Sequence, residues 1–293
     1  MEIIGTGLSG LVGSRVTKLL SHGFSFSDLS KETGVDLMDF STVKDMITAS
    51  PAPWVFHFAA YTDVQQAEQE KALGKDSVSW KVNVSATENI VNICTGAGKK
   101  LLYISTDYVF DGTKSEYNEN DTPNPISWYG QTKYEGEKLV SRLGKQSLII
   151  RIANPFRSNP VGKMDFIHKM LDRMKSGLEI QAPNDQVFCP TYIDDLATSL
   201  EKLISLDATG IYHVVSKTGI TPYSAAKEVA SKFEINNALI KPVSYDTYFS
   251  GKALPPRQAL LKHDIIDASG ILLHTFAEGL HEVIKQERML SHI

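Results

Sequence analysis

A tyrosine and a lysine, Tyr129 and Lys133, stand four residues apart in a segment of good helix formers. That spacing places the two side chains on one helical face, one turn from each other. A phenol has an unperturbed pKa near ~10 and exchanges protons poorly at neutral pH. An ammonium beside it favours the phenolate and lowers that pKa, so the pair is suited to proton transfer.

A hydroxyl group, that of Thr106, precedes this pair at the end of the apolar run Leu101–Ile104. There it can hold a substrate oxygen beside the phenol. The three groups together suit proton delivery to a carbonyl that receives a hydride. A Tyr and a Lys at helical spacing also arise by chance on a solvated helix face, so the rest of the chain must decide between the two interpretations.

A glycine-rich turn lies close to the start of the chain. Gly7, Gly10 and Gly13 follow the apolar residues Ile3 and Ile4 and open an amphipathic segment. In dinucleotide-binding turns such glycines permit a tight bend, close approach to a pyrophosphate and tight helix–strand packing. The helix N-terminus then faces the phosphates with the positive end of its dipole. The spacing is GxxGxxG, and a plain strand–helix turn is an equally good interpretation of the glycines alone.

Cofactor preference is predicted from Asp28, which follows the second apolar run, Phe24–Phe26. A carboxylate there accepts hydrogen bonds from the adenosine ribose and repels a 2′-phosphate, which favours NAD(H) over NADP(H). Lys31 nearby can still tolerate NADP(H). Asp36 is placed either near the adenine or simply in a loop.

Alternating strands and helices predict the fold class. Residues 54–60 and 148–152 form continuous apolar runs, typical of strands buried on both faces of a parallel sheet. Between them, residues 77–94 are helical in period, and Asn83 within them lies either near the site or on the surface. Strand–helix alternation predicts right-handed βαβ units and an α/β, Rossmann-type doubly wound parallel sheet.

The pattern changes after residue 154, where we expect a smaller α+β substrate-binding domain. The predicted division gives residues 1–154 plus 191–218 to the dinucleotide-binding domain and 155–190 plus 219–293 to the smaller one. Asp194 and Asp195 are predicted to N-cap the helix that runs to Leu203. The other predicted elements are helices over 166–174 and 222–234, strands over 179–181, 210–215 and 240–245, and a mostly helical stretch from about 265.

Composition narrows the classes of function. A net charge of -4 gives no sign of nucleic-acid or membrane affinity. Cys94 and Cys189 are far apart, which argues against a disulfide framework, and the histidines and cysteines show no metal-ligand spacing. No signal segment opens the chain and no apolar run approaches a membrane span. We expect a cytoplasmic protein without a metal.

With these pieces in place, the chain resembles the extended short-chain dehydrogenase/reductases and, more closely, the dTDP-4-dehydrorhamnose reductase family. The resemblance runs along most of the chain, and STDYVFDG followed by YGQTK is its most specific part. The matching motifs are TGLSGLVG at 6–13, AAYTDVQQAE at 59–68, STDYVFDG at 105–112, YGQTKYEGEK at 129–138 and PTYIDDLA at 190–197.

The resemblance implies roles for individual residues. Tyr129 would donate the proton, Lys133 would assist it and bind the nicotinamide ribose, and Thr106 would orient the substrate carbonyl. Asp107 would touch the sugar beside Thr106. The implied cofactor contacts are Gly7, Leu8, Ser9 and Gly10 along the pyrophosphate, Asp28 on the adenosine ribose, Asp36 and Leu37 near the adenine, and Ala59, Ala60 and Tyr61 from the next strand.

Two departures fall where the sugar nucleotide would bind. The family usually has a tryptophan-bearing segment where this chain has Ala153-Asn154-Pro155, which makes Asn154 a candidate substrate contact. Its usual C-terminal Arg-Pro motif is Pro255-Pro256-Arg257 here, and Arg257 can still pair with a diphosphate. Reductase chemistry is therefore a firmer inference than the rhamnose substrate.

The favoured interpretation is an NAD(P)H-dependent reductase of a nucleotide-linked 4-keto-6-deoxy sugar, with a homodimer as one possible assembly. A second is an epimerase or dehydratase that retains its NAD through a turnover. A third is a non-catalytic regulatory subunit resembling the methionine adenosyltransferase beta subunit. Retention of Thr106, Tyr129 and Lys133 argues against the third.

Overall fold

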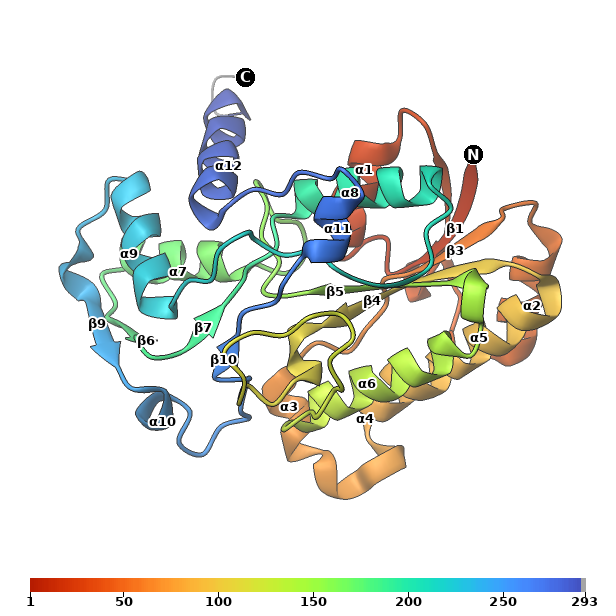
Figure 1. The fold of residues 1–293 in the computed structure, drawn as a ribbon, viewed down its shortest axis with the longest axis horizontal. Coiled ribbons are helices and arrows are strands. Elements are labelled where there is room, and N and C mark those ends of the chain that lie inside the picture. The colour runs from red at the N-terminus through yellow and green to blue at the C-terminus, as the bar shows by residue number, and fades with distance from the viewer. Residues whose placement is uncertain (291–293) are drawn as a thin grey trace.

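A six-stranded parallel sheet forms the centre of the molecule in the computed structural model, which describes residues 1–290 (Figure 1). Its strand order is β2-β1-β3-β4-β5-β8, and every neighbouring pair is parallel. The strands are β1 Glu2–Thr6, β2 Ser25–Leu29, β3 Trp54–His57, β4 Lys100–Thr106, β5 Ser147–Ile152 and β8 Gly210–His213. This order confirms the predicted α/β, doubly wound fold.

Helices cover both faces of this sheet. In Figure 1, α1 (Gly13–Leu20) and α8 (Ile193–Ser205) lie above it, whereas α2 (Phe40–Ala49), α5 (Ala86–Ala97) and α6 (Trp128–Ser141) lie below it. Neighbouring strand residues point to opposite faces. Phe56 therefore enters the core shared with α1 and α8, while Val55 enters the core shared with α2 and α5.

The predicted helix over 77–94 is interrupted by a wider turn. It comprises α4 (Val78–Trp80), a π-helical turn over Lys81–Ser85, and then α5. Asn83 lies inside the π turn with 1% of its surface exposed, so it is not a surface residue. A π turn adds a residue to the helical repeat, and such turns are frequent at functional sites.

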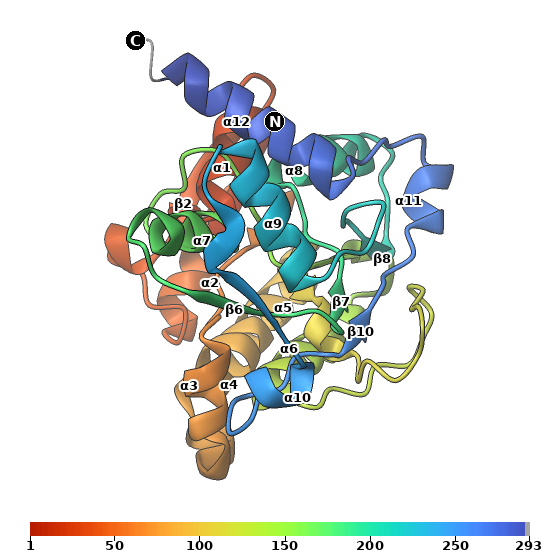
Figure 2. The same ribbon diagram turned by 90° about the vertical axis from the view of Figure 1, so that its left-hand side faces the viewer.

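The smaller domain packs three helices around an apolar cluster that contains Phe156, Ile167 and Phe276. Its helices are α7 (Phe166–Lys175), α9 (Pro222–Lys232) and α12 (Phe276–Leu290), shown beside one another in Figure 2. Its strands pair as β6 (Ile180–Pro183) with β9 (Ile240–Val243), and β7 (Val187–Phe188) with β10 (Gln258–Ala259). Of the short helices, α10 (Tyr245–Tyr248) falls within this domain, whereas α3 (Val64–Gln69) and α11 (Asp264–Ala268) pack on the side of the large sheet.

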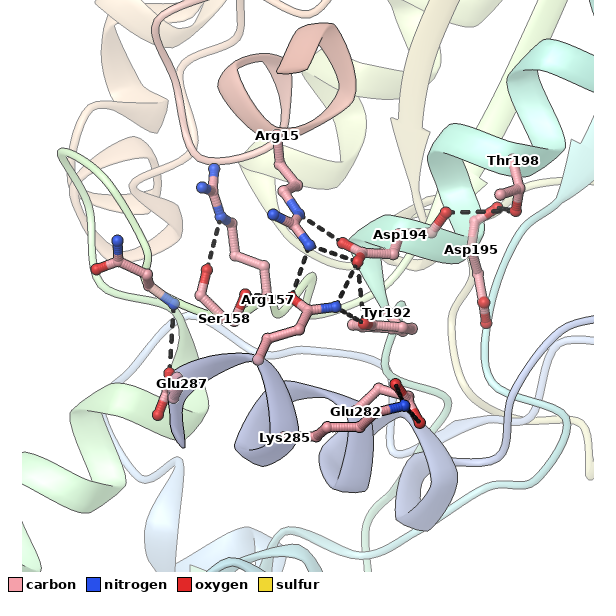
Figure 3. A network of polar contacts seen from close by, with 12 residues as sticks. Arg15, Arg157, Ser158, Tyr192, Asp194, Asp195, Thr198, Glu282, Lys285 and Glu287 are labelled. Atoms are coloured by element: carbon pink, nitrogen blue, oxygen red, sulfur yellow. Dashed lines mark hydrogen bonds and ion pairs between the residues drawn. The ribbon is translucent and has the colours of Figure 1, made fainter. Parts of the chain in front are cut away.

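The predicted N-cap at Asp194 and Asp195 is wrong. Helix α8 begins at Ile193, and Tyr192 occupies the cap position without a side-chain cap bond. The two carboxylates serve tertiary contacts instead. Asp194 accepts hydrogen bonds from Arg15 of α1, including one at 2.7 Å (Figure 3), and Asp195 accepts from the backbone N–H of His274 at 2.7 Å.

The segment after β10 returns to the large sheet before the chain ends. Ile266, Ile271 and Leu273 belong to the core cluster of α1 and α8, although the sequence division assigned them to the smaller domain. We propose the predicted two-domain division, with the segment that contains Ile266, Ile271 and Leu273 added to the dinucleotide-binding domain. Residues 291–293 of the predicted helical tail lie outside the described part. Among the described helices, none combines the length and apolar character needed to cross a membrane.

Candidate active site

The glycine turn lies at the carboxyl edge of the sheet, where the strand order reverses between β1 and β3. Ligands of doubly wound sheets bind at such a reversal. Gly7 has φ +66°, and a Cβ on it would stand 2.6 Å from the backbone nitrogen of Ala59. A Cβ on Gly13 would stand 2.4 Å from the carbonyl oxygen of Gly7. These two glycines are therefore required by the turn itself.

Gly10 has a different role, because a Cβ there would meet only the Gly7 oxygen, at 3.3 Å. Gly10 and Ser9 are exposed, so this part of the turn offers bare backbone at the start of α1. Backbone N–H groups at a helix start favour an anion such as a pyrophosphate. The turn thus fits a dinucleotide on the geometry of its own backbone.

A cavity of about 400 Å³ extends from this turn to α6. The predicted site residues that line it are Gly7, Gly10, Ala60, Thr106, Asp107, Tyr129, Lys133 and Asn154. The predicted residues outside its lining are Leu8, Ser9, Asp28, Asp36, Leu37, Ala59, Tyr61 and Arg257. For both sets, a contact with cofactor or substrate stays a prediction.

Asp28 lies at the end of β2 with spare hydrogen-bonding capacity. Its Oδ2 accepts a hydrogen bond from the Ser30 hydroxyl at 2.7 Å, while its buried Oδ1 has no partner. A carboxylate with an unused acceptor fits a ribose hydroxyl. Asp36 accepts from the backbone of Met38 at 3.0 Å within the turn before α2, and the Leu37 carbonyl accepts from Asn89 of α5 at 3.1 Å.

Tyr129 and Lys133 are brought to Thr106 by close packing at the start of α6. Ser127 caps this helix by accepting from the backbone of Gly130 at 3.2 Å. A Cβ on Gly130 would stand 2.2 Å from the Tyr108 carbonyl oxygen, so only glycine lets the helix meet the turn after β4. In that turn the Thr106 hydroxyl donates to Asp107 Oδ1 at 3.0 Å.

Burial dominates the electrostatics of the site. It raises the pKa of the Tyr129 phenol above its ordinary value, although a hydrogen bond with Thr106 acts in the opposite direction. The predicted lowering of this pKa by Lys133 is therefore wrong, because burial penalises the charged phenolate and the charge of Asp107 raises the pKa further. Burial also lowers the pKa of Lys133 to about 7, with Glu137 opposing, and raises that of Asp107 to about 7.

Two supporting residues complete the arrangement. The Asn83 side chain accepts from the Tyr61 N–H at 2.8 Å and donates to the Thr132 hydroxyl at 3.0 Å, which ties the strand end to α6. Tyr103 lies under Lys133 and was missed, because it stands inside an apolar strand and has no motif of its own. Asn83 could be singled out from the sequence because it is a polar residue within an otherwise apolar helical segment.

A second and larger cavity, of about 730 Å³, lies toward the smaller domain. It shares with the first cavity the lining residues Asp107, Tyr108, Asn154, Phe166 and Lys169, so the two meet beside Thr106 and Tyr129. Arg257 lines neither cavity. Its guanidinium is engaged by Asp185 at 2.5 Å and Asp246 at 3.5 Å.

The parallel sheet, the glycine turn at its reversal point and the Thr–Tyr–Lys set define a Rossmann-type protein of the short-chain dehydrogenase/reductase class. The model of the family described as the RmlD substrate binding domain matches residues 1–289. The chain belongs to this family.

Named relatives agree with this assignment. The dTDP-4-dehydrorhamnose reductase of Aggregatibacter actinomycetemcomitans is 30% identical over 279 residues, covering 91% of this chain and 92% of that protein. The methionine adenosyltransferase 2 subunit beta of Bos taurus is 30% identical over 297 residues, covering 96% and 86%. The crystal structure of dTDP-4-dehydrorhamnose reductase from Bacillus anthracis in complex with NADP superposes with a TM-score of 0.88 at 29% identity, covering 97% and 99%.

Proposed function

We propose that this protein is an NAD(P)H-dependent reductase of a nucleotide-linked 4-keto-6-deoxy sugar. The observation that carries the proposal is the position of Thr106, Tyr129 and Lys133. All three line the cavity that begins at the glycine turn, and Thr106 adjoins Asp107, which lines this cavity and the larger one. A carbonyl compound entering from the larger cavity would therefore meet the phenol and the dinucleotide site together.

A bound nicotinamide cofactor would supply the hydride to the carbonyl carbon. The residues of this chain would supply the proton to the carbonyl oxygen. Tyr129 keeps its proton at neutral pH because burial raises its pKa, so it is suited to the acid role. The Thr106 hydroxyl would orient the carbonyl oxygen, and the Lys133 ammonium would stabilise the negative charge that develops on the phenol oxygen.

The identity of the sugar and of the cofactor is proposed on less direct support. A nucleotide-linked keto sugar is favoured by the reductase relative and by a cavity of about 730 Å³, a size within the range of small-molecule sites. NAD(H) is slightly favoured over NADP(H), because Asp28 would oppose a 2′-phosphate. The NADP in the Bacillus anthracis structure belongs to that protein.

A ligand screen tests this proposal. The purified protein is heated in the presence of NADH with dTDP-, UDP-, GDP- and CDP-linked sugars, and then assayed for NADH oxidation with the 4-keto-6-deoxy derivative of each nucleotide that binds. A ligand of the folded state raises the melting temperature. We expect one nucleotide class to do so and its keto sugar to be reduced. Binding of NADH without reduction of any keto sugar would contradict the reductase proposal.

A regulatory subunit is the second candidate, and one observation favours it. Methionine adenosyltransferase beta subunits are as similar to this chain as the reductase is, at 30% identity. For this candidate, affinity purification from the native cell would recover a larger synthetase in fixed ratio, and addition of this protein would change the synthetase's kinetics. Keto-sugar reduction by the isolated chain would exclude a purely regulatory role.

A further inference from the structure

One face of helix α7 forms a wall of the larger cavity. Phe166, Lys169, Met170 and Arg173, at positions i, i+3, i+4 and i+7, all line it. The buried positions of the same helix are Ile167, Leu171 and Met174, which pack in the core of the smaller domain. Helical periodicity therefore fixes Lys169 and Arg173 on the cavity side, one turn apart.

This pair of cations is not neutralised by an ion pair within residues 1–290. The Lys169 ammonium has no hydrogen bond or ion pair, and Arg173 donates only to the backbone carbonyl of Glu179, at 2.8 Å. Like charges four apart on a helix repel each other and destabilise it. Arg257, in contrast, is paired with two carboxylates and lines neither cavity. Two unpaired cations aimed into a cavity are suited to an anionic ligand.

Lys169 lines both cavities, whereas Arg173 lines only the larger one. We propose that Lys169 and Arg173 bind the diphosphate of a nucleoside diphosphate, with Lys169 on the phosphate nearer to Tyr129. Aromatic rings line the same cavity at Tyr248 and Phe249, and they offer a surface for the base. The attached sugar, which depends on the proposed function, would then occupy the junction beside Thr106.

Two carboxylates also line this cavity, Asp107 and Glu179, and both would repel a diphosphate. Asp107 lies at the junction and is engaged by the Thr106 hydroxyl, so it faces the sugar end. Glu179 is exposed and adjoins Arg173, whose guanidinium its backbone carbonyl holds in place. Lys169 and Arg173 are exposed as Glu179 is, so solvent screens all three charges, and the two cations outnumber the one carboxylate beside Arg173.

The experiment measures binding of dTDP, UDP, GDP and CDP by calorimetry with NADH present, so that it needs no turnover. The variants are Lys169→Met, Arg173→Met and, as a matched control, Lys175→Met, which is exposed on the same helix and lines neither cavity. We expect a loss of about 10- to 100-fold in affinity for each of the first two and no change for the control. The free nucleoside should bind all four proteins alike.

The outcomes separate this inference from the proposed function. Diphosphate affinity that survives in both variants, or falls in Arg257→Met instead, would overturn the inference even if keto sugars are reduced. Absence of any nucleoside diphosphate binding to the wild type would also overturn it. If Lys169→Met weakens NADH and not the diphosphate, Lys169 belongs to the cofactor site and the inference is wrong. Diphosphate binding that depends on both cations, without sugar reduction, would support the inference and contradict the reductase.

Discussion

The ammonium nitrogen of Lys133 lies 4.0 Å from the centre of the Tyr103 ring. Tyr103 is fully buried on β4, and a Cβ on Gly136 would stand 2.3 Å from its hydroxyl oxygen. The ring is therefore held tightly beneath α6. A desolvated cation over an aromatic face gains about 2 kcal/mol, so Tyr103 positions the ammonium as well as filling the core.

Substitution of Tyr103 tests this positioning role. Tyr103→Phe keeps the ring, so it should retain kcat within about twofold, whereas Tyr103→Leu should lower kcat by roughly 10- to 30-fold. The measurement is steady-state reduction with the sugar found in the screen, together with the pH profile. If Tyr103 has a purely structural role, the fall in rate at alkaline pH should be the same in Tyr103→Leu as in the wild type. An equal loss of kcat in both variants would argue against the ring contact.

The pH dependence should follow Lys133. Burial lowers the pKa of this ammonium to about 7 despite the opposing charge of Glu137, so the free protein loses the charge as pH rises through 7. We expect kcat/KM for reduction to fall above about pH 7, because that parameter reports groups of the free enzyme. Asp107→Asn removes the other group whose pKa is about 7, and kcat/KM of this variant should still fall above about pH 7. A profile flat to pH 9 would contradict the assignment.

Removal of the phenolic hydroxyl should abolish most of the proton transfer. Tyr129→Phe keeps the ring and its edge contact with Tyr108, whose centroid lies 5.4 Å away, so NADH affinity should survive. Turnover should fall by about 10²- to 10⁴-fold, the usual contribution of a positioned acid. Thr106→Val should cost less, because only one hydrogen bond to the carbonyl is lost. Unchanged turnover in Tyr129→Phe would mean that the phenol is structural.

Much of the fold was predictable because single runs of residues determine it. The apolar runs at 54–60 and 148–152 became β3 and β5, and the amphipathic segment at 166–174 became α7. The cap at Asp194 was mispredicted, because the acid's partner, Arg15, is 179 residues away in the sequence. Local patterns cannot distinguish a capping carboxylate from one engaged in a distant ion pair.

In the candidate site too, local patterns predicted some residues, whereas other properties depend on parts of the chain that are distant in sequence. Tyr129 and Lys133 were predictable from helical spacing, since they share one turn of α6. The shift in the phenol's pKa was predicted with the wrong sign, because burial depends on the whole core and not on the neighbouring lysine. Lys169 and Arg173 on α7 have a spacing that is common in helices, so the sequence alone does not indicate a binding role. The cavity that they line suggests that role.

Cofactor preference should depend on Asp28. Its carboxylate would repel a 2′-phosphate, so NADH should bind at least as well as NADPH. Asp28→Ser should weaken the binding of NADH by about tenfold and leave the binding of NADPH unchanged. Lys31→Met serves as a control for the positive charge near Asp28. The measurement is fluorescence titration of each cofactor. A clear preference of the wild type for NADPH would show that Asp28 does not face the ribose.

The charge of His168 should stabilise the contact between α7 and α12. Its Nδ1 lies 2.7 Å from Asp165 Oδ1 and its Nε2 lies 2.8 Å from Glu287 Oε1. Burial alone would lower the pKa of this imidazole, but the two carboxylates outweigh it and raise the pKa to about 9. Because the folded-state pKa exceeds the ordinary value of 6.5, the stabilisation is complete below pH 6.5 and is lost as the pH rises through 9.

Replacement of this imidazole by a neutral amide tests the effect. His168→Gln should lower the free energy of unfolding by up to roughly 3 kcal/mol at pH 6, and the difference from wild type should shrink steadily between pH 6.5 and 9. Urea denaturation at several pH values provides the measurement. His281→Gln is the matched control for the substitution itself, because His281 is exposed on the same helix α12 as Glu287. A His168→Gln difference that is constant from pH 6 to 9 would mean that packing, and not the imidazolium charge, accounts for the contribution of His168.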